Sequence, residues 1–397
     1  MNARWRNFRA VFEFVVVAVC ICTFAFTAMG IFASMLGDGA AGTRDYVEYW
    51  AASRQLVHHA DPYDAVAILR LEDSAGYPEG LPAQLMPNPP SALLLVLPLG
   101  LMSPTAAEWL WILLLLASFA VSVQMLRSML APDGGRVHLI AYAFAPALSC
   151  LLAGQVGIFL LLGLVLFLRW HRSRPMLAGA ALWFCLLKPH LFLVFGLVLL
   201  IWIVFTRNYR ILTGAAIALA VSGVVASVLD PGVWDQYRQM MGTARVDRTP
   251  LPCLGVFLRQ QVYPHTFWIQ CLPAASGCAW AVVYFWKRRR VWNWIEDGSI
   301  LMLVSVLVAP YSWFMDQAVL IPAVLAGAYA ARSRTLIAVL ALMSAGIEIA
   351  AARGVILASP FYLWTAPGWL LWFLIATRQR GSAERRLNPK MSQMISR

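Results

Sequence analysis

The sequence has few charged residues: 13% of its 397 residues are charged, while 61% are hydrophobic. Soluble domains carry about 25% charged residues, so the shortage indicates that lipid covers much of this protein. The sequence also lacks a GxxxxGKS/T loop, a GxGxxG element following a strand, an HExxH motif and a CxxC pair. Nucleotide hydrolysis, dinucleotide chemistry and a zinc site therefore have no support, and we expect no cofactor and no metal.

Cysteines are few and scattered. They lie at positions 20, 22, 150, 185, 253, 271 and 278, and their spacing fits no metal site. Most of them fall in apolar runs, where cysteine acts as a small hydrophobic residue. Whether Cys253 and Cys271 form a disulfide stays open at the level of sequence.

Positive charge is in excess, with a formal net charge of +12 at pH 7. In a soluble protein this excess would indicate nucleic-acid binding. In an apolar chain it indicates membrane orientation, because the cytoplasmic loops of membrane proteins collect Lys and Arg. We therefore expect contact with membrane lipids and no nucleic acid.

The N-terminus combines three arginines, Arg4, Arg6 and Arg9, with an apolar run over residues 11–33. The apolar part of a signal peptide is about 7–15 residues long, whereas a run of roughly 20 residues can span a bilayer. We predict a signal-anchor helix that follows a cytoplasmic N-terminus at residues 1–10.

The short apolar run 91–102 determines the topology, because it reverses every later segment if it crosses the membrane. If it stays on the outer side, the basic clusters fall in the cytoplasm, as the positive-inside rule requires. We therefore predict an all-α integral membrane protein, a helical bundle with about 12 transmembrane segments and both termini cytoplasmic. After residues 11–33 the segments are 104–126, 138–152, 156–168, 175–187, 190–206, 211–229, 264–286, 298–309, 316–331, 335–351 and 357–376.

This topology divides the chain into a cytoplasmic N-terminus (1–10), a transmembrane domain (11–377) and a basic cytoplasmic tail (378–397). The transmembrane domain has two large outer loops, residues 34–103 and residues 230–263, and we expect surface or re-entrant helices in the first. Some segments are shorter than the roughly 20 residues that a straight spanning helix needs. Short or broken helices occur in membranes where they line a cavity within the protein.

Polar residues that interrupt the apolar pattern fall on the outer side in this topology. They belong to an acidic and aromatic stretch after residue 44, an Asn-Pro-Pro element, a Gly-Gln pair, a Lys-Pro-His element and the segment 310–316. Because the topology rests on basic residues alone, this convergence predicts one site on the outer face. Its candidate residues are Asp45, Tyr46, Tyr49, Trp50, Asn88, Gln155, Lys188, His190, Tyr311, Trp313 and Asp316.

Each charged candidate also has a simpler structural explanation. Asp45 can be a solvated loop acid, and Asp316 can cap the helix that follows it. Lys188 interrupts an apolar stretch, where an ionisable residue costs about 2.5–3.5 kcal/mol and by default marks function. The alternative for Lys188 is a helix-end lysine whose ammonium reaches the membrane surface, and His190 can bond a nearby carbonyl.

The order of these motifs resembles glycosyltransferase family 87, whose members are bacterial multi-span enzymes of the GT-C class. The similar elements cover about residues 45–320, and His59-Ala60 and Asn88 depart from the family pattern, which leaves the acceptor open. The elements are D-Y-x-x-Y-W-x-A at 45–52, D-P-Y-D at 61–64, P-P-x-A-L at 89–93, G-Q at 154–155, K-P at 188–189 and P-x-S-W at 310–313.

The resemblance implies a GT-C-type fold and a transferase that uses polyprenyl-phosphate sugars, for example an α-(1→2)-mannosyltransferase. It matches Asp45 to the general base beside the acceptor hydroxyl, and one base with direct displacement implies inversion. The leaving phosphate needs cationic stabilisation, which we assign to Lys188 and His190. To sugar or acceptor binding we assign Tyr46, Tyr49, Trp50, Asn88, Gln155, Tyr311, Trp313 and Asp316.

We therefore expect a hexosyltransferase of cell-envelope synthesis that moves a hexosyl unit to a glycolipid or glycan acceptor. Mannosyl is the first candidate for the transferred unit. It would act on the outer face of the bacterial inner membrane. One alternative is a transporter or flippase of lipid-linked sugars, which would carry charges along a path between both faces; apart from Glu13, such charges are nearly absent. A second is a non-catalytic partner in envelope biosynthesis, which would tolerate loss of Asp45.

Overall fold

The computed structural model describes residues 3–36, 42, 44–131, 136–243, 251–331 and 333–387. Throughout these ranges the chain forms α-helices and short 3-10 helices and no strand, which confirms the all-α prediction. Residues 37–41 and 43 of the first outer loop, 244–250 of the second and 388–397 of the tail lie outside the described residues.

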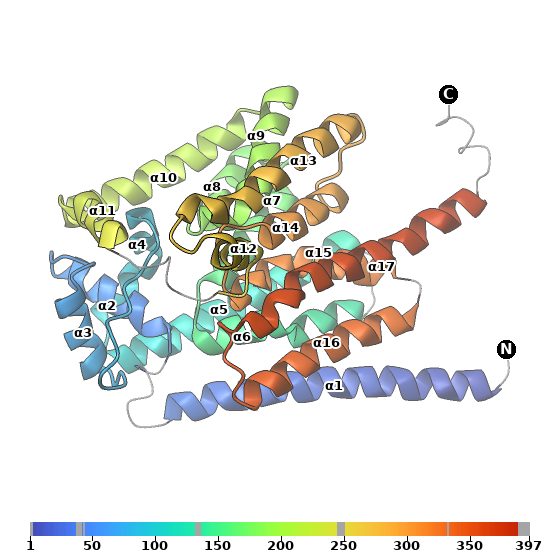
Figure 1. Cartoon of the computed structure of the whole chain (residues 1–397), viewed down its shortest axis with the longest axis horizontal. Coiled ribbons are helices and arrows are strands. Elements are labelled where there is room, and N and C mark those ends of the chain that lie inside the picture. Colours follow the sequence, from blue (N-terminus) through green and yellow to red (C-terminus); the bar gives the residue numbers. More distant parts are fainter. Residues whose placement is uncertain are drawn as a thin grey trace.

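Different helices lie at the two ends of the molecule (Figure 1). α1 (Ala3–Leu36) runs along one side, and the start of α1 and the end of α17 (Thr365–Leu387) lie at the same end of the molecule. Short helices gather at the opposite end: α2 (Tyr46–Val57), α3 (Ala65–Ser74), α4 (Leu93–Val96) and α11 (Val233–Thr243). Both predicted outer loops therefore contribute to one end of the molecule, away from the start of α1 and the end of α17.

The segment that determines the predicted topology does not form one continuous helix. It consists of η2 (Pro90–Ala92), α4 and η3 (Leu97–Leu101), with prolines at positions 90 and 98. These pieces pack against α2 and α10. Because the whole segment is shorter than the roughly 20 residues of a spanning helix, its placement on the outer side stays our prediction.

Five helical segments among the described residues are long and apolar enough to cross a membrane. Each coincides within a few residues with a predicted apolar segment, so the chain is a membrane protein. The total of about 12 crossings stays a prediction. The five are α5 (Pro104–Leu130), η5 with α9 (Pro189–Phe192 and Leu193–Thr206), α10 (Arg210–Leu229), η7 with α13 (Phe267–Cys271 and Leu272–Arg288) and α16 (Arg334–Ala352).

The remaining helices are shorter or contain more polar residues. They are η4 (Val137–Ala143), α6 (Ala145–Ala153), α7 (Gly157–Trp170), α8 (Pro175–Cys185), α12 (Leu254–Val262), α14 (Glu296–Leu307), η8 (Phe314–Leu320), α15 (Ile321–Ala330), η9 (Pro360–Trp364) and α17 (Thr365–Leu387). Because α17 continues to Leu387, the first half of the predicted tail at 378–397 is helical.

Three pairs of successive helices meet at non-helical turns inside the molecule. α6 and α7 meet at Gly154, whose left-handed backbone with φ of 76° ends α6. α8 and η5 meet at Lys188, which precedes Pro189 and therefore avoids the helical conformation. α14 ends at Leu307, and Pro310 lies between it and η8. Non-helical backbone at membrane depth is tolerated where protein surrounds it.

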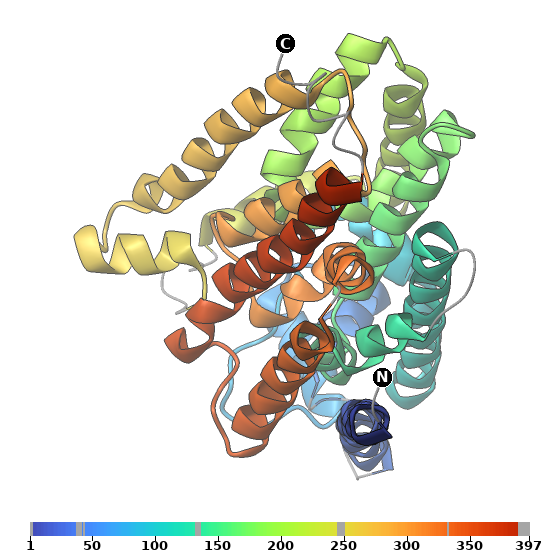
Figure 2. The same cartoon turned by 90° about the vertical axis from the view of Figure 1, so that its right-hand side faces the viewer.

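Aromatic side chains fill the interior of the bundle. Trp294 is 2% exposed, and its ring lies 5.2 Å from Phe167, 5.0 Å from Phe195 and 5.5 Å from Trp202 between centroids. Such tilted and edge-to-face pairs contribute about 0.5–1.5 kcal/mol beyond the burial of their area. This packing joins α7, α9 and the start of α14. α1, by contrast, lies at the periphery beside α16 (Figure 2).

Candidate active site

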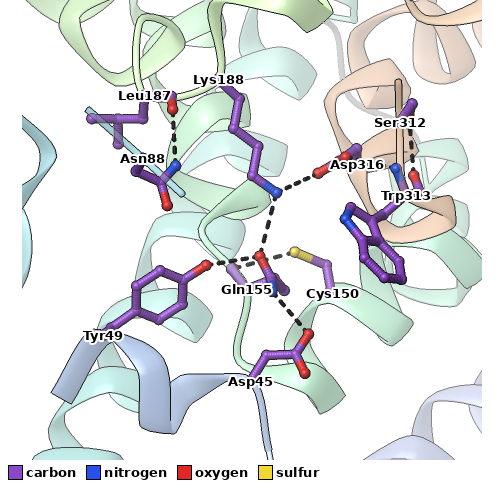
Figure 3. A network of polar contacts seen from close by, with 10 residues as sticks. All are labelled: Asp45, Tyr49, Asn88, Cys150, Gln155, Leu187, Lys188, Ser312, Trp313 and Asp316. Carbon is purple, nitrogen blue, oxygen red and sulfur yellow. Dashed lines mark hydrogen bonds and ion pairs between the residues drawn. The ribbon is translucent and has the colours of Figure 1, made fainter. Parts of the chain in front are cut away.

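The three internal turns and the start of α2 bring polar side chains together (Figure 3). Asp45 immediately precedes α2, Gln155 lies between α6 and α7, Lys188 lies between α8 and η5, and Asp316 lies in η8. Asp45 and Gln155 are 110 positions apart in the sequence, and Lys188 and Asp316 are 128 positions apart. The tertiary structure thus joins four of the predicted site residues.

The side-chain amide of Gln155 links the acidic and basic parts of the site. Its Nε2 donates to Oδ2 of Asp45 at 2.8 Å. Its Oε1 accepts from the hydroxyl of Tyr49 at 2.8 Å and from Nζ of Lys188 at 3.3 Å. An amide has donors at one end and an acceptor at the other, so Gln155 bonds a carboxylate and an ammonium at the same time.

Lys188 forms a buried ion pair with Asp316. Nζ of Lys188 lies 2.7 Å from Oδ1 of Asp316, and the two side chains are 10% and 1% exposed. The second carboxylate oxygen of Asp316 accepts the backbone N–H of Trp313 at 2.9 Å. Asp316 therefore caps η8, which agrees with the helix-capping role considered for it in the sequence, and it also pairs with Lys188.

Neighbouring side chains hold the turns that carry Gln155 and Lys188. Nδ2 of Asn88 donates to the carbonyl of Leu187 at 2.8 Å, next to Lys188. The thiol of Cys150 donates to the carbonyl of Gln155 at 3.3 Å. Oδ1 of Asn88 is buried and has no hydrogen-bond partner among the described residues.

The surroundings of Asp45 make it a stronger base than an ordinary aspartate. Burial raises the pKa of Asp45 above its usual value of 3.8, whereas the hydrogen bond from Gln155 and the charges of Lys188 and Arg44 lower it. Burial has the larger effect, because desolvation disfavours the charged form. A carboxylate with a raised pKa accepts a proton more readily near neutral pH.

Glu48 lies one helical turn after Asp45 and is 8% exposed. Burial, together with the negative charge of Asp45, raises the pKa of Glu48 to about 8. Glu48 therefore keeps its proton near neutral pH, since neighbouring carboxylates resist ionising together. Glu48 is not among the site residues predicted from the sequence, although its spacing of three residues from Asp45 on a helix signals that the two side chains are neighbours.

His190 stacks on Tyr311 beside the ion pair. The two rings are 3.8 Å apart between centroids, with an interplanar angle of 23°. Nε2 of His190 is buried and has no hydrogen-bond partner among the described residues. The predicted alternative, in which His190 bonds a nearby carbonyl, therefore has no support at this nitrogen.

Two predicted sugar-binding aromatics, Tyr46 and Trp50, do not face the site. Tyr46 is 0% exposed and donates its hydroxyl to the carbonyl of Pro104 at 2.8 Å. Trp50 is 4% exposed and donates its indole N–H to the carbonyl of Met102 at 3.2 Å. Burial leaves neither ring a free face, so the structure gives no support to their assignment to sugar or acceptor binding. Tyr49 is also 0% exposed, so it takes part through its hydroxyl alone.

No group of three His, Cys, Asp or Glu side chains in the described part of the chain lies close enough together to hold a metal ion. All seven cysteines are free, so the structure does not pair Cys253 with Cys271. The chemical groups that the site offers are therefore a base, a buried cation and hydrogen-bonding side chains.

The family model of glycosyltransferase family 87 matches residues 87–310. No curated protein and no solved structure gave a significant match. The matched region contains Asn88, Gln155, Lys188 and His190, whereas Asp45 lies well before its start and Asp316 lies shortly after its end. The match covers more than half of the chain and confirms the resemblance seen in the sequence motifs. The chain therefore belongs to glycosyltransferase family 87 and is a membrane glycosyltransferase.

Proposed function

We propose that this enzyme transfers a hexosyl unit, with mannosyl as the first candidate, from a polyprenyl-phosphate sugar to a glycolipid or glycan acceptor. The observation that carries the proposal is the pair of opposite charges bonded to one amide, the carboxylate of Asp45 and the ammonium of Lys188 on Gln155. Transfer from a sugar phosphate needs a base for the acceptor hydroxyl and a cation for the leaving phosphate.

In the proposed reaction the acceptor oxygen forms a bond to the anomeric carbon while the bond from that carbon to the phosphate oxygen breaks. The acceptor proton passes to the carboxylate of Asp45, and polyprenyl phosphate leaves with the electron pair. Because the acceptor enters opposite the leaving group, this single displacement inverts the anomeric carbon. The raised pKa of Asp45 favours the proton transfer.

The phosphate side of the site is assigned to Lys188, with His190 beside it. Two of the three N–H donors of the ammonium bond Asp316 and Gln155, and the third has no partner among the described residues. A buried cation attracts the negative charge that develops on the phosphate more strongly than an exposed one. Asp316 holds this cation in place rather than binding sugar, which changes its predicted role.

The sugar and acceptor side is assigned to Tyr311, Trp313 and Asn88. The two aromatic side chains are partly exposed, so each has ring surface available for contact with a sugar. The unpartnered Oδ1 of Asn88 can accept a hydrogen bond from a sugar hydroxyl.

We further propose that the reaction occurs on the outer face of the bacterial inner membrane. α2, which follows Asp45, lies at the end of the molecule opposite the start of α1 and the end of α17 (Figure 1). The basic loops favour a cytoplasmic position for the termini. The apolar helices leave the polyprenyl chain of the donor in contact with the bilayer.

The first test is transfer of radiolabelled sugar from several polyprenyl-phosphate donors in membranes that contain the wild type, Asp45→Asn or Asp73→Asn. Asn keeps the size of Asp and can still hydrogen-bond Gln155, but it cannot take a proton. Loss of a general base lowers the rate by about 100- to 10,000-fold. Asp73 is an exposed acid on α3, so its variant serves as the matched control.

We expect transfer by the wild type and by Asp73→Asn, and none above background by a folded Asp45→Asn. Equal transfer by Asp45→Asn would move the base elsewhere, with Asp316 the next candidate. Absence of transfer by all three proteins across mannosyl, other hexosyl and pentosyl donors would contradict the proposed donor class.

A further inference from the structure

Arg44, the residue before Asp45, is one of the most completely bonded side chains near the site. Its Nε donates to the carbonyl of Leu152 at 2.6 Å, and its NH2 donates to the carbonyl of Leu151 at 2.6 Å. Its NH1 donates to Oε1 of Glu108 on α5 at 3.1 Å. Arg44 is 5% exposed and Glu108 is 1% exposed, so the pair is buried.

The two carbonyls that Arg44 contacts belong to the last turn of α6. The last carbonyls of a helix lack the usual partner within the helix. The guanidinium fork bonds two of them with one planar group, and the carbonyl of Leu151 also accepts the backbone N–H of Gly154 at 3.2 Å. The chain then reverses at Gly154, whose carbonyl accepts the indole N–H of Trp111 at 2.6 Å. The next residue, Gln155, donates its side-chain amide to Asp45.

Two consecutive residues therefore contact one turn at two places. Arg44 bonds the backbone just before Gly154, and Asp45 bonds the side chain just after it. Moving the guanidinium would change where the carboxylate lies relative to Gln155, because the two residues share a peptide bond. Glu108 supplies the opposite charge that makes burial of the guanidinium tolerable.

We infer that Arg44, with Glu108 as its counter-ion, is a positioning residue that fixes the Asp45 carboxylate on the α6–α7 turn and sets the electrostatic field around it. The inference rests on the proposed function, in which Asp45 is the general base. Arg44 and Glu108 contact neither substrate nor the reacting atoms, and they act through Asp45 and Gln155.

The pair has a property that packing alone does not explain: its two members act on Asp45 with opposite sign. The charge of Arg44 lowers the pKa of Asp45, so we expect its removal to raise that pKa. Glu108 is the negative charge paired with Arg44, so we expect its removal to leave the positive charge uncompensated and to lower the pKa of Asp45. The other titratable groups near Asp45 stay present in both variants. They are Glu48 and Tyr49 on α2, Lys188 before η5, and Asp316 in η8.

The test compares Arg44→Gln, Arg44→Lys and Glu108→Gln in the full-length enzyme, with kcat/KM measured against pH and heat-induced unfolding measured in the same detergent. The matched control is the exposed pair of Arg238 and Asp235 on α11, whose side chains are 74% and 71% exposed. Arg238→Gln and Asp235→Asn make the same chemical changes away from the site, and we expect both to keep the wild-type pH profile.

We expect the acid limb of the Arg44→Gln profile to move to higher pH, and that of Glu108→Gln to move to lower pH, each by up to about one unit. Arg44→Lys keeps the charge but loses the fork, so its acid limb should stay in place while kcat falls. A displacement of about 1 Å at a reacting group lowers the rate by about 100-fold, and we expect a loss of this order in kcat with little change in KM for the donor.

Glu108→Gln retains an oxygen that accepts from Arg44, so it is the variant best able to fold. If its acid limb stays at the wild-type pH, or moves in the same direction as that of Arg44→Gln, the inference is overturned. Unchanged kcat in a folded Arg44→Lys would overturn it as well. If Arg44→Gln does not fold, the other two variants still test the inference. A shift of the Glu108→Gln acid limb to lower pH together with a reduced kcat for Arg44→Lys supports it, and absence of either result overturns it.

Asp45→Asn, measured in parallel, separates this inference from the proposed function. An inactive Asp45→Asn together with wild-type profiles for the Arg44 and Glu108 variants would leave Asp45 as the base and remove the positioning role. An active Asp45→Asn would instead contradict the proposed function, and the positioning role would fall with it.

Discussion

Gln155 carries no charge, yet it determines how the two charged residues of the site lie relative to each other. Its amide group places Asp45 on the nitrogen side and Lys188 on the oxygen side. A carboxylate at this position would repel Asp45, and an ammonium would repel Lys188. A neutral group with both a donor and an acceptor is therefore the side chain that fits between opposite charges.

Lys188→Met should lower kcat/KM for the polyprenyl-phosphate donor by about 100- to 1,000-fold, the range for loss of one group that stabilises developing charge. The variant should also be less stable by about 3–5 kcal/mol, since Asp316 would remain as a buried, unpaired charge. Initial rates across donor concentrations and unfolding midpoints in detergent measure the two effects.

The double variant Lys188→Met/Asp316→Asn separates these two effects. It removes the unpaired charge, so we expect it to recover stability relative to Lys188→Met without recovering transfer. Wild-type kinetics in the single variant would remove Lys188 from the phosphate site.

Glu48 should make stability depend on pH. Its pKa is raised from 4.5 to about 8 by burial and by the charge of Asp45. Between these two values the unfolded chain releases the proton while the folded chain keeps it, so this contribution to stability falls as pH rises and is lost above about 8. Wild-type unfolding midpoints should therefore fall over this window relative to those of Glu48→Gln.

The control for this measurement is Glu79→Gln, which changes an exposed glutamate in the same loop. Its midpoints should follow those of the wild type at every pH. If the difference in unfolding midpoint between wild type and Glu48→Gln is the same below pH 4.5 as above pH 8, Glu48 does not titrate in this way.

At the scale of elements, the turn between α6 and α7 carries the largest share of the site geometry. Gly154 has a φ of 76°, and a Cβ atom at this residue would lie 2.9 Å from Cβ of Tyr46. The glycine therefore serves both a left-handed backbone and a close approach to α2. The same turn is bonded by Arg44 and by Trp111, so a shift here would move Gln155 away from Asp45.

Gly154→Ala should destabilise the protein by at least about 1–2 kcal/mol, the cost of a left-handed backbone for a residue with a Cβ. We expect a larger loss in transfer than in stability, because Tyr46 must also move. Gly346→Ala on α16 is the control, since its added Cβ meets no atom within 4 Å and should stabilise the helix by about 0.5–1 kcal/mol. Full transfer by Gly154→Ala would show that the turn tolerates displacement.

For the whole molecule, the arrangement of the helices separates two ends. The start of α1 and the end of α17 lie at one end, and the short helices of the two predicted outer loops lie at the other (Figure 1). Membership of a glycosyltransferase family favours the transferase over the flippase and assembly-partner alternatives. The predicted topology places the end that carries the start of α1 in the cytoplasm.

Reporter fusions can determine this orientation. Fusions after Arg172 and Arg289 should report the cytoplasm, and a fusion after Glu79 should report the outer face, since basic loops are retained inside. Alkaline phosphatase and a fluorescent protein, attached at the same positions, give opposite signals and check each other. A fusion at Arg172 or Arg289 that reports the outer face would reverse the topology and place Asp45 on the cytoplasmic side.

The amino-acid sequence alone determined the class of this protein. Long apolar runs and scarce charge predict membrane helices, because the bilayer accepts apolar surface and rejects unpaired charge. The same cost made Lys188 conspicuous, and the order of short motifs indicated the family. These signals lie in short stretches of the sequence and reflect how the bilayer treats apolar and charged residues. They can therefore be recognised without a tertiary structure.

Only the tertiary structure decided which polar side chains meet. The ion pair of Lys188 with Asp316 and the bridge from Asp45 through Gln155 join residues more than 100 positions apart, and their pairing depends on where broken helices end. The tertiary structure also decided which side of α2 faces the site. Positions 45 and 49 share one face by helical spacing, while Tyr46 and Trp50 turn into the core. Burial, which sets the pKa of Glu48 and the role of Arg44, exists only once the helices have packed.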